Sequence, residues 1–487
     1  MAISFAQIPS TIRTPFIFVE YDPSNAQQGP ILQPYTALHI GNRLSTGTVA
    51  ELTPKLVTSA DQAAQFWGSG SMLHLMAVAW FANNRTVKLW QIAQDDGAGA
   101  KATSDLTVTG TATADGTVYL YVNGTRIQVA VTNGDDANTV AAAIDAAVTA
   151  EVGLPVTSSV TTNVVTLTSV HAGETANEHD ARFNYAEGEE FPDGVTITAA
   201  AFASGTGSPD ITAVWPVIET EQYHVIAVGN RDTTTLADVK AEMAARADAL
   251  RMQEGVAFFG ARQTHAEAVN EGLAQNSGFD SILSIDESLE ASYQIAAAYC
   301  GQVAAAAQSD PARPFKTLSL NGINPPTLAK RFTRAERQTL LESGAATWYV
   351  DPGGVVRIER AISTFTLNAL GVADTAYLQL NTAFTLSYLR FAVRARFSSR
   401  YPRHKLGDDG KRYGAGQAIV TPARARAEFV GLFLEWEELG LVENLEQFKR
   451  DLIVERNPSD PNRLDAVLPT DLVNQLEVMA VKLQFLL

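Results

Sequence analysis

The chain has a single cysteine, Cys300, among its 487 residues. One thiol excludes an internal disulfide and any metal site built from several cysteines. Cys300 lies in an alanine-rich run, residues 295–307, so we expect it to be a small core residue. This scarcity of cysteine fits a protein that folds in a reducing compartment.

Long apolar runs are also missing. The longest lies near residues 72–81, contains His74, and is too short to cross a bilayer. Residues 1–5 show no basic segment followed by an apolar one, so no secretory signal is expected. The sequence therefore predicts a soluble protein without membrane insertion.

Basic charge is scarce overall. The chain has 36 Lys and Arg against 53 Asp and Glu, a net charge of −17, which argues against a general nucleic-acid binder. Much of the excess lies in residues 101–210, which hold three basic and fourteen acidic side chains, a net of −11. Thr, Val, Ala and Gly dominate there, and an Asn123-Gly124 turn predicts a hairpin over residues 117–129. We expect a β-rich inserted domain with an acidic, solvated surface.

Recognisable catalytic and cofactor motifs are absent. None of the seven histidines lies in a triad motif, and no G-x-S-x-G or H-E-x-x-H occurs. The glycine-serine turn at residues 68–71 has no lysine, and the loop at residues 229–233 has no G-x-G-x-x-G. His171, Glu178 and His179 do not have the spacing of metal ligands. We expect no catalytic, cofactor-binding or metal site, and no enzyme.

Two parts of the chain alternate apolar strands with helices. Unbroken apolar strands are predicted at residues 37–41, 86–92, 223–229, 255–260 and 280–285. Helices are predicted between them, for example from Ser59 and over residues 235–252. This pattern indicates an α/β core with a mostly parallel sheet covered on both faces. A long helix is predicted over residues 370–400.

One stretch is strongly basic. Residues 390–426 hold ten Lys or Arg and two acids, a net of +8. Nucleic-acid binding, a solvated helix face with a loop, and contact with an acidic protein surface are three interpretations. The acidity of the whole chain favours the third, a contact with a neighbouring copy or with a different partner. The candidate side chains are Arg390, Arg394, Arg396, Arg400, Arg403, Lys405, Lys411 and Arg412.

Both ends of the chain carry apolar strand-forming runs. Val481, Leu483 and Phe485 alternate with Lys482 and Gln484, which is strand period. Such a segment pairs either with the chain's own sheet or with another copy by strand donation. A similar run at residues 16–21 includes Phe16, Phe18 and Tyr21. Arms at both ends are the pattern of a protein that weaves into a polymer.

The C-terminal quarter resembles a known family. Glu455-Arg456-Asn457, the run over residues 460–465 and the run over residues 469–475 are similar to the C-terminus of contractile tail sheath proteins of Mu-like phages. Residues 402–410 and 436–444 resemble the same family. The resemblance covers residues 390–487 closely and residues 1–95 loosely.

This resemblance implies a fold, a function and partners. It implies a subtilisin-like core with extended N- and C-terminal arms that add strands to neighbouring subunits. It implies a helical polymer around a tail tube protein, which contracts to drive the tube through the host envelope for genome delivery. Baseplate and tail terminator proteins are further expected partners. The expected locations are the virion tail and, during assembly, the host cytoplasm.

Two rival functions remain from the sequence. A sheath of a phage-derived bacteriocin or secretion apparatus would have the same features. An α/β enzyme with a β-rich accessory domain is the other alternative. The predicted division of the chain is an N-terminal arm (1–36), a first core part (37–96), an acidic β-rich insertion on the outside (97–210), a second core part (211–372), a C-terminal sheath domain (373–476) and a C-terminal strand arm (477–487).

Overall fold

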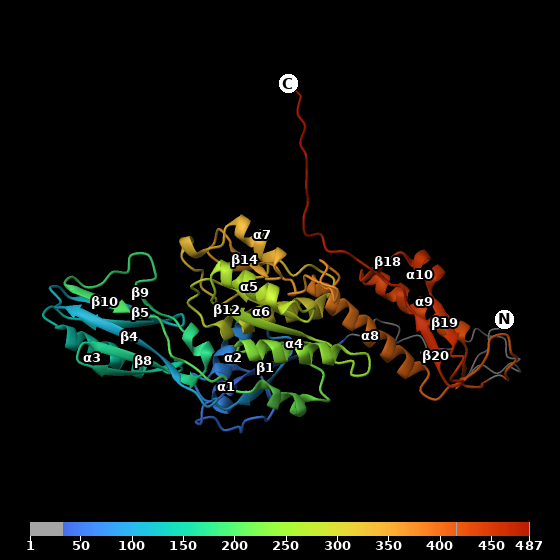
Figure 1. The fold of residues 1–487 in the computed structure, drawn as a ribbon, viewed down its shortest axis with the longest axis horizontal. Coiled ribbons are helices and arrows are strands. Elements are labelled where there is room, and N and C mark those ends of the chain that lie inside the picture. Colours follow the sequence, from blue (N-terminus) through green and yellow to red (C-terminus); the bar gives the residue numbers. More distant parts are fainter. Residues whose placement is uncertain (1–32, 415, 487) are drawn as a thin grey trace, which may run out of the picture.

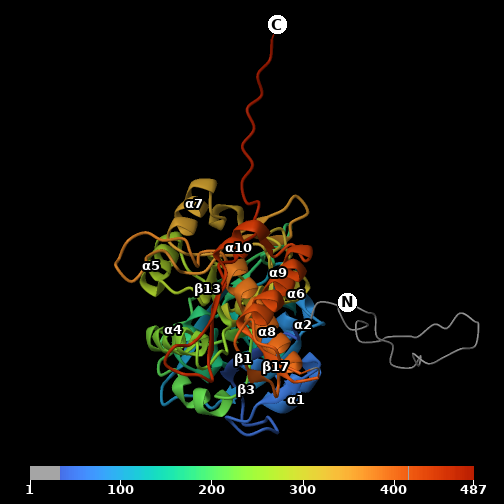
Figure 2. The ribbon, with the colours of Figure 1, turned by 90° about the vertical axis from the view of Figure 1, so that its right-hand side faces the viewer.

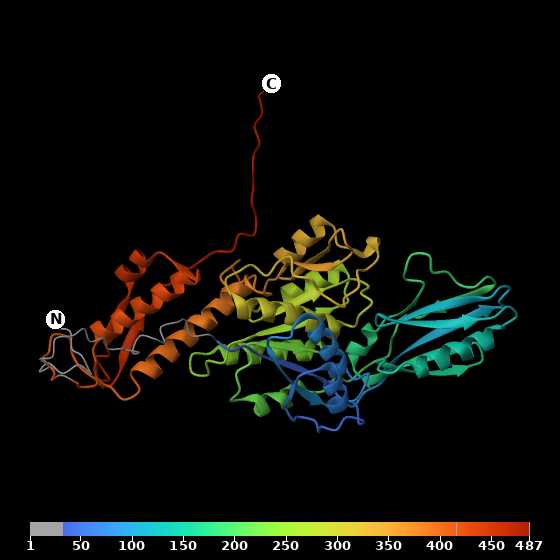
Figure 3. The same cartoon turned by 180° about the vertical axis from the view of Figure 1, so that it is seen from behind.

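Three bodies lie in a row in the computed structural model, which describes residues 33–414 and 416–486. Figure 1 shows an α/β core in the middle, a β-rich domain at one end and a mainly helical domain at the other. The view from behind shows the same order (Figure 3). The predicted N-terminal strand residues Phe16, Phe18 and Tyr21 lie outside the described residues.

A six-stranded sheet forms the middle body. Its strands, in spatial order, are β13 (Asp280–Ser284), β12 (Val256–Ala261), β11 (Val225–Val228), β1 (Thr36–Asn42), β3 (Lys88–Gln94) and β2 (Lys55–Val57). Five of them run parallel, and only β2 pairs antiparallel, with β3. These pairings confirm the predicted mostly parallel core sheet. Continuous apolar strands of this kind are stable only when both faces of the sheet are covered.

Helices cover both faces of this sheet. On one face, α2 (Met72–Asn83) and α6 (Ser292–Ser309) share a core cluster with alternate strand residues such as Phe258. On the other face, α4 (Thr233–Ala247) and the 3-10 helix η3 (Ile211–Ile218) pack on residues such as Phe259. Smaller helices border the core: α1 (Ala60–Trp67), α5 (His265–Gln275), η4 (Leu328–Lys330) and α7 (Arg334–Glu342). The predicted N-cap Ser59 accepts from the backbone N–H of Gln62.

The β-rich domain is inserted between β3 and β11 and has a core of its own. One antiparallel sheet has four strands: β10 (Val195–Ala199), β4 (Lys101–Gly110), β8 (Val164–Ala172) and β7 (Val156–Thr161). The other has three: β6 (Thr125–Val131), β5 (Gly116–Val122) and β9 (Ala181–Phe183). Helix α3 (Ala137–Ala150) and the short η2 (Glu174–Glu178) complete it. The predicted hairpin with its Asn123-Gly124 turn is β5 and β6.

One long helix joins the core to the third body. The first turns of α8 (Leu380–Arg400) pack in the core with Leu380 and Phe384, and its later turns pack with Leu389 and Ala392 in a separate cluster. That cluster is built on α9 (Pro422–Glu438) and α10 (Leu445–Asp451). Short strands surround it: β16 (Lys405–Leu406), β17 (Ile419–Val420), β18 (Val442–Glu443), β19 (Ile453–Arg456), β20 (Leu464–Val467) and β21 (Asp471–Leu472). Before α8, β14 (Thr347–Val350) and β15 (Val356–Arg360) form an antiparallel hairpin.

Two predicted helices are too long. The helix predicted over residues 370–400 begins only at Leu380, because the Asn368 and Asp374 side chains accept from nearby backbone N–H groups and hold a loop. The helix predicted to residue 252 ends at Ala247, where the Asp248 carboxylate accepts from the N–H of Leu250. Among the described residues, no helix is long and apolar enough to cross a membrane.

Candidate assembly surfaces

The segment over residues 473–486 leaves the body of the molecule without secondary structure. Figure 2 shows it extending away from the third body. Leu483 is 90% exposed and Phe485 is 82% exposed, and Val481 is exposed as well. In the described part of the chain, these three predicted strand residues have no strand partner. The tail is thus not a final strand of the chain's own sheet.

The start of the tail is fixed to the core. The backbone N–H of Val473 donates to the carbonyl of Leu441 at 3.1 Å, directly after β21 pairs with β18. The Gln475 amide donates to the carbonyl of Ala312 at 3.2 Å, and the Lys316 ammonium donates to the carbonyl of Leu476. These contacts set the direction in which residues 477–486 leave the molecule.

The hairpin β19–β20 lies close to the tail in the sequence, and no further described strand pairs with either of its edges, which we call its open edges. It is a sheet of only two strands among the described residues. Val454 and Leu464 pack toward α9, whereas the paired Ile453 and Val467 are exposed. An unpaired strand edge presents free backbone N–H and C=O groups to any further strand.

Residues that resemble the sheath family build the loop of this hairpin. The Asn457 backbone N–H donates to the carbonyl of Arg463 at 2.9 Å, and its amide donates to the Asp465 carboxylate at 2.6 Å. Arg456 donates to the carbonyl of Pro461 and pairs with Asp408 at 2.8 Å. The loop is therefore fixed by its own side chains, which keeps the two strands in register.

The basic stretch divides into paired and free side chains. Arg390 pairs with Glu254 at 2.6 Å, Arg396 with Glu435 and Arg400 with Glu428 at 3.0 Å. Lys405 donates to the Gln417 amide at 3.0 Å. Four exposed cations of the predicted set have neither an ion-pair partner nor a hydrogen-bond partner within the described chain: Arg394, Arg403, Lys411 and Arg412. The structure thus leaves half of the eight predicted contact residues available.

Three buried histidines, His171, His179 and His224, are each held by hydrogen bonds to neighbours. The His171 Nδ1 lies 2.7 Å from the Asp96 carboxylate, but its Nε2 accepts from the backbone N–H of Met72. Burial lowers the pKa of His179 to about 3 and the pKa of His224 to about 4, so both are neutral at physiological pH. An imidazole whose second nitrogen already accepts a backbone N–H has no free site for a substrate proton.

The three residues considered as metal ligands have other partners. Glu178 pairs with Arg231, and the His179 ring lies between the Asn123 amide and the Ser169 hydroxyl. His171 is engaged with Asp96. Within residues 33–414 and 416–486, no three His, Cys, Asp or Glu side chains gather as a metal-binding group.

Comparison with known proteins decides the family. Sequence models of three phage tail sheath domains match the chain: the β-sandwich domain over residues 97–206, the central domain over 204–364 and the C-terminal domain over 372–485. The tail sheath protein of the Mu-like prophage FluMu of Haemophilus influenzae is 38% identical over 488 residues, which is 100% of each chain. The chain belongs to the phage tail sheath family. It is a subunit of a Mu-like contractile tail sheath and a structural component of the virion tail, as the resemblance implied.

One solved structure shares the fold of this sheath protein, and a second is similar to it. The sheath tail protein of Desulfitobacterium hafniense has a TM-score of 0.51 at 12% identity, over 95% of this chain and 98% of that chain. The helical sheath of the anti-feeding prophage in its contracted state has a TM-score of 0.49 at 9% identity, over 97% and 99% of the two chains.

The sequence did not reveal how the β-rich domain of the sheath protein is attached. Arg231, in the loop that follows β11, pairs with Glu178 of the β-rich domain and with Glu271 of α5. Arg262 pairs with Asp180 at 2.8 Å. From the sequence, the loop over residues 229–233 is compared only with nucleotide-binding motifs. The sequence feature that could have indicated the attachment is Arg231, a basic residue directly after an apolar strand in a chain with an acidic inserted domain.

Proposed function

We propose that this sheath subunit polymerises helically around a tail tube protein and that neighbouring copies are joined by donated strands. One observation supports this most directly: the chain carries both an exposed, unpaired apolar tail and a two-stranded hairpin with open edges. Adding the tail of one copy to the hairpin of another would bury the apolar side chains of the tail and pair a free edge of the hairpin. The backbone hydrogen bonds of the added strand provide affinity, and its alternating side chains fix its register. Contraction of the polymer then drives the tube through the host envelope and delivers the genome.

The donated strand is the tail, and the acceptor is β19–β20 of the next subunit. Ten extended residues reach about 33 Å, enough to pass from one subunit to another. Alternation places Val481, Leu483 and Phe485 on one face, where they continue the apolar layer under the hairpin. Lys482 then lies on the outer face beside Glu455 and Asp465, whose positions are paired in the hairpin.

The apolar run at residues 16–21 is the second donated strand in this proposal. Phe16, Phe18 and Tyr21 have the alternation of a strand that buries one face. A hairpin with two open edges has room for one strand on each side. Two donors per acceptor would link each subunit to more than one neighbour, which keeps the polymer connected while the subunits move.

The free cations would provide the electrostatic contact. Arg394, Arg403, Lys411 and Arg412 are exposed, whereas Arg390, Arg396 and Arg400 are neutralised within the chain. Free cations on a surface favour an acidic partner surface and speed the encounter. We assign them to the tube or to a neighbouring subunit. The acidic β-rich domain, at the opposite end of the molecule (Figure 1), would then face outward.

We assign no cofactor and no catalytic activity to the subunit. The free energy that drives contraction would be stored in a metastable extended polymer. Baseplate and tail terminator proteins would hold the two ends of the polymer. Assembly would take place in the host cytoplasm. The core sheet would follow the subtilisin-like layout, with no hydrolytic site.

Electron microscopy of the purified protein tests this function. The full chain should form hollow striated cylinders, and a variant that lacks residues 478–487 should remain as single subunits with an unchanged melting temperature. Cylinders from the shortened chain would disprove strand donation by the tail. Uniform small particles from the full chain, under every condition of salt and concentration, would disprove self-assembly.

A further inference from the structure

Residues 367–373 form an exposed apolar loop ahead of α8, which we call the knob. Leu370 is 87% exposed and Val372 is 58% exposed. Ala369 and Ala373 beside them are exposed as well. Exposed apolar side chains that gather on one loop mark a contact with another molecule more often than single exposed ones do.

The knob is firmly built. At its base, the Asn276 amide oxygen accepts from the N–H groups of Thr366 and Leu367 at 2.8 and 2.9 Å, and its NH₂ donates to the Leu367 carbonyl. At its tip, the Asn368 oxygen accepts from the N–H groups of Leu370 and Val372. A loop held in one conformation loses little entropy on binding. The apolar tip is therefore presented ready for a partner.

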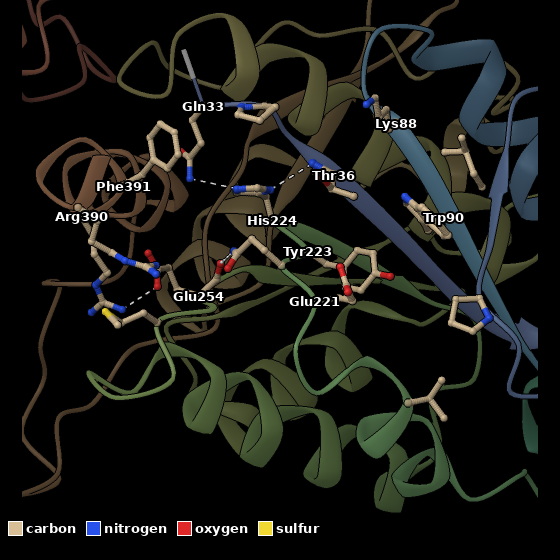
Figure 4. A pocket seen from close by; sticks show the side chains of 17 residues that line it. Gln33, Thr36, Lys88, Trp90, Glu221, Tyr223, His224, Glu254, Arg390 and Phe391 are labelled. Atoms are coloured by element: carbon tan, nitrogen blue, oxygen red, sulfur yellow. Dashed lines mark hydrogen bonds and ion pairs between the residues drawn. The ribbon is translucent and has the colours of Figure 1, made fainter. Parts of the chain in front are cut away.

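A complementary cavity lies beside α8, and we call it the hollow. It has a volume of about 760 Å³ and lies between α8 and the first residues of β1, β3 and β11, as Figure 4 shows. Leu56 and Val217 in its wall are exposed, and Trp90 and Phe391 are half-buried. A cavity of this size holds a compact group of apolar side chains.

Charge distinguishes the rim of the hollow from the base of the knob. Lys88 and Arg394 on the rim are exposed and have no ion-pair partner within the described chain. The lining also holds the exposed Glu221 and the Arg390–Glu254 pair, so its three basic and two acidic side chains give a net charge of +1. Asp374 follows the knob directly, and only one of its carboxylate oxygens is engaged, with the N–H of Ala376 at 2.8 Å. The two surfaces are thus complementary in charge as well as in apolar character.

We propose that the knob of one subunit occupies the hollow of the next. This proposal rests on the assembly function above and adds a contact between copies that does not involve donated strands. Two different surfaces of one chain that bind each other make a head-to-tail contact, and repeated head-to-tail contacts produce an open helical polymer. Leu370 and Val372 enter the apolar wall, and Asp374 faces Lys88 and Arg394.

The first test measures the protein concentration above which cylinders form. Leu370→Asp should raise this concentration at least about tenfold, as expected for loss of a central apolar contact. The melting temperature of the single subunit should stay unchanged, because Leu370 has few contacts in its own chain. Leu328→Asp is the matched control, since Leu328 is 79% exposed in η4, and it should assemble within about twofold of the parent chain. An unchanged assembly concentration for Leu370→Asp would overturn the proposal.

The second test uses cysteine cross-linking, because the only native thiol, Cys300, is buried. Cylinders of a Leu370→Cys, Leu56→Cys double variant, treated with a short bismaleimide linker, should give a ladder of covalent multimers. Cylinders mixed from the two single variants should stop at dimers. Intact cylinders without cross-links would refute the contact and leave the assembly function standing. Failure of the parent chain to form any cylinders would refute the assembly function itself.

Discussion

Asp280 is the acid whose burial has the clearest consequence at the residue scale. It begins β13 and has no exposed surface. Burial raises its pKa to about 6, although the Thr364 hydroxyl and the Gln275 amide donate to its carboxylate. The folded state therefore holds a proton on Asp280 that the unfolded state releases near pH 4.

We predict that Asp280→Asn stabilises the protein at neutral pH. Because the folded pKa is the higher one, the destabilising effect of Asp280 grows as pH rises from about 4 to 6 and is complete above that window. The amide keeps the shape and removes the charge, so the free energy of unfolding should rise by on the order of 2–3 kcal/mol at pH 7.5. At pH 4 the two proteins should be equal.

Thermal melts of the parent chain and Asp280→Asn at several pH values measure this difference. Asp374→Asn serves as the control, because Asp374 is a partly exposed loop residue and its turn survives the change. A variant that melts lower than the parent at pH 7.5 would show that the carboxylate's hydrogen bonds outweigh the cost of burying its charge.

The interaction partners of buried charged residues such as Asp280 and Arg231 could not be predicted from the sequence. Asp280 accepts from Thr364, and Arg231 pairs with Glu178 and Glu271, so every partner lies on another element. The spacing of apolar residues in a sequence indicates which positions are buried. It does not indicate which residue pairs with a charged side chain at such a position. In the same way, the sequence does not show which arginines of residues 390–426 form ion pairs, because the partners of Arg396 and Arg400 are glutamates of α9.

Elements were predictable where the apolar pattern was long or continuous. The strands β11 and β12 are unbroken apolar runs, and both were predicted from the sequence. The strand in the tail, predicted from its alternation, stays a prediction. The strands β19 and β20 have four residues each and include Glu455, Arg456 and Asp465, so their pairing was not predicted. The open edges to which we assign the donated strands were missed for this reason.

We predict that the two faces of the tail differ in their importance for assembly. Leu483→Asp should abolish cylinders, because it would place a charge in the apolar layer under the neighbour's hairpin. Gln484→Asp changes the adjacent residue on the opposite face and should assemble like the parent chain. Electron microscopy and sedimentation measure both. Equal loss of assembly by the two variants would indicate that the tail is not bound as a strand.

The loops at the end of the third body allow an electrostatic prediction. Reversing the free cations in Arg403→Glu, Lys411→Glu, Arg412→Glu should weaken binding to the tube or the neighbouring subunit at low salt. The difference from the parent chain should shrink as salt rises toward 1 M, because screening removes the attraction. Arg450→Glu is the control, since Arg450 is also exposed but lies on α10. Co-sedimentation with assembled tubes measures the effect, and a salt-independent loss would contradict an electrostatic contact.

At the scale of the whole molecule, the β-rich domain closes the carboxyl edge of the parallel sheet. Ligands of α/β proteins usually bind at this edge. Here Arg231 and Arg262, which follow β11 and β12, turn toward Glu178 and Asp180 of the inserted domain. His171 of the same domain accepts the N–H of Met72 at the start of α2. The edge that would hold a substrate in an enzyme instead holds a domain, which these ion pairs and this hydrogen bond join to the core.

We therefore predict that Arg231→Met uncouples the β-rich domain from the core. The change leaves Glu178 and Glu271 mostly buried without their partner, which costs about 3–5 kcal/mol. The parent chain should unfold with these two bodies in a single calorimetric transition, and the variant should show a separate transition for the domain, which has its own core. Arg450→Met is the control, because Arg450 pairs with Asp451 on α10, away from the two bodies, and both side chains are exposed. Its thermogram should match that of the parent, and a single transition for Arg231→Met would show that apolar contacts alone join the two bodies.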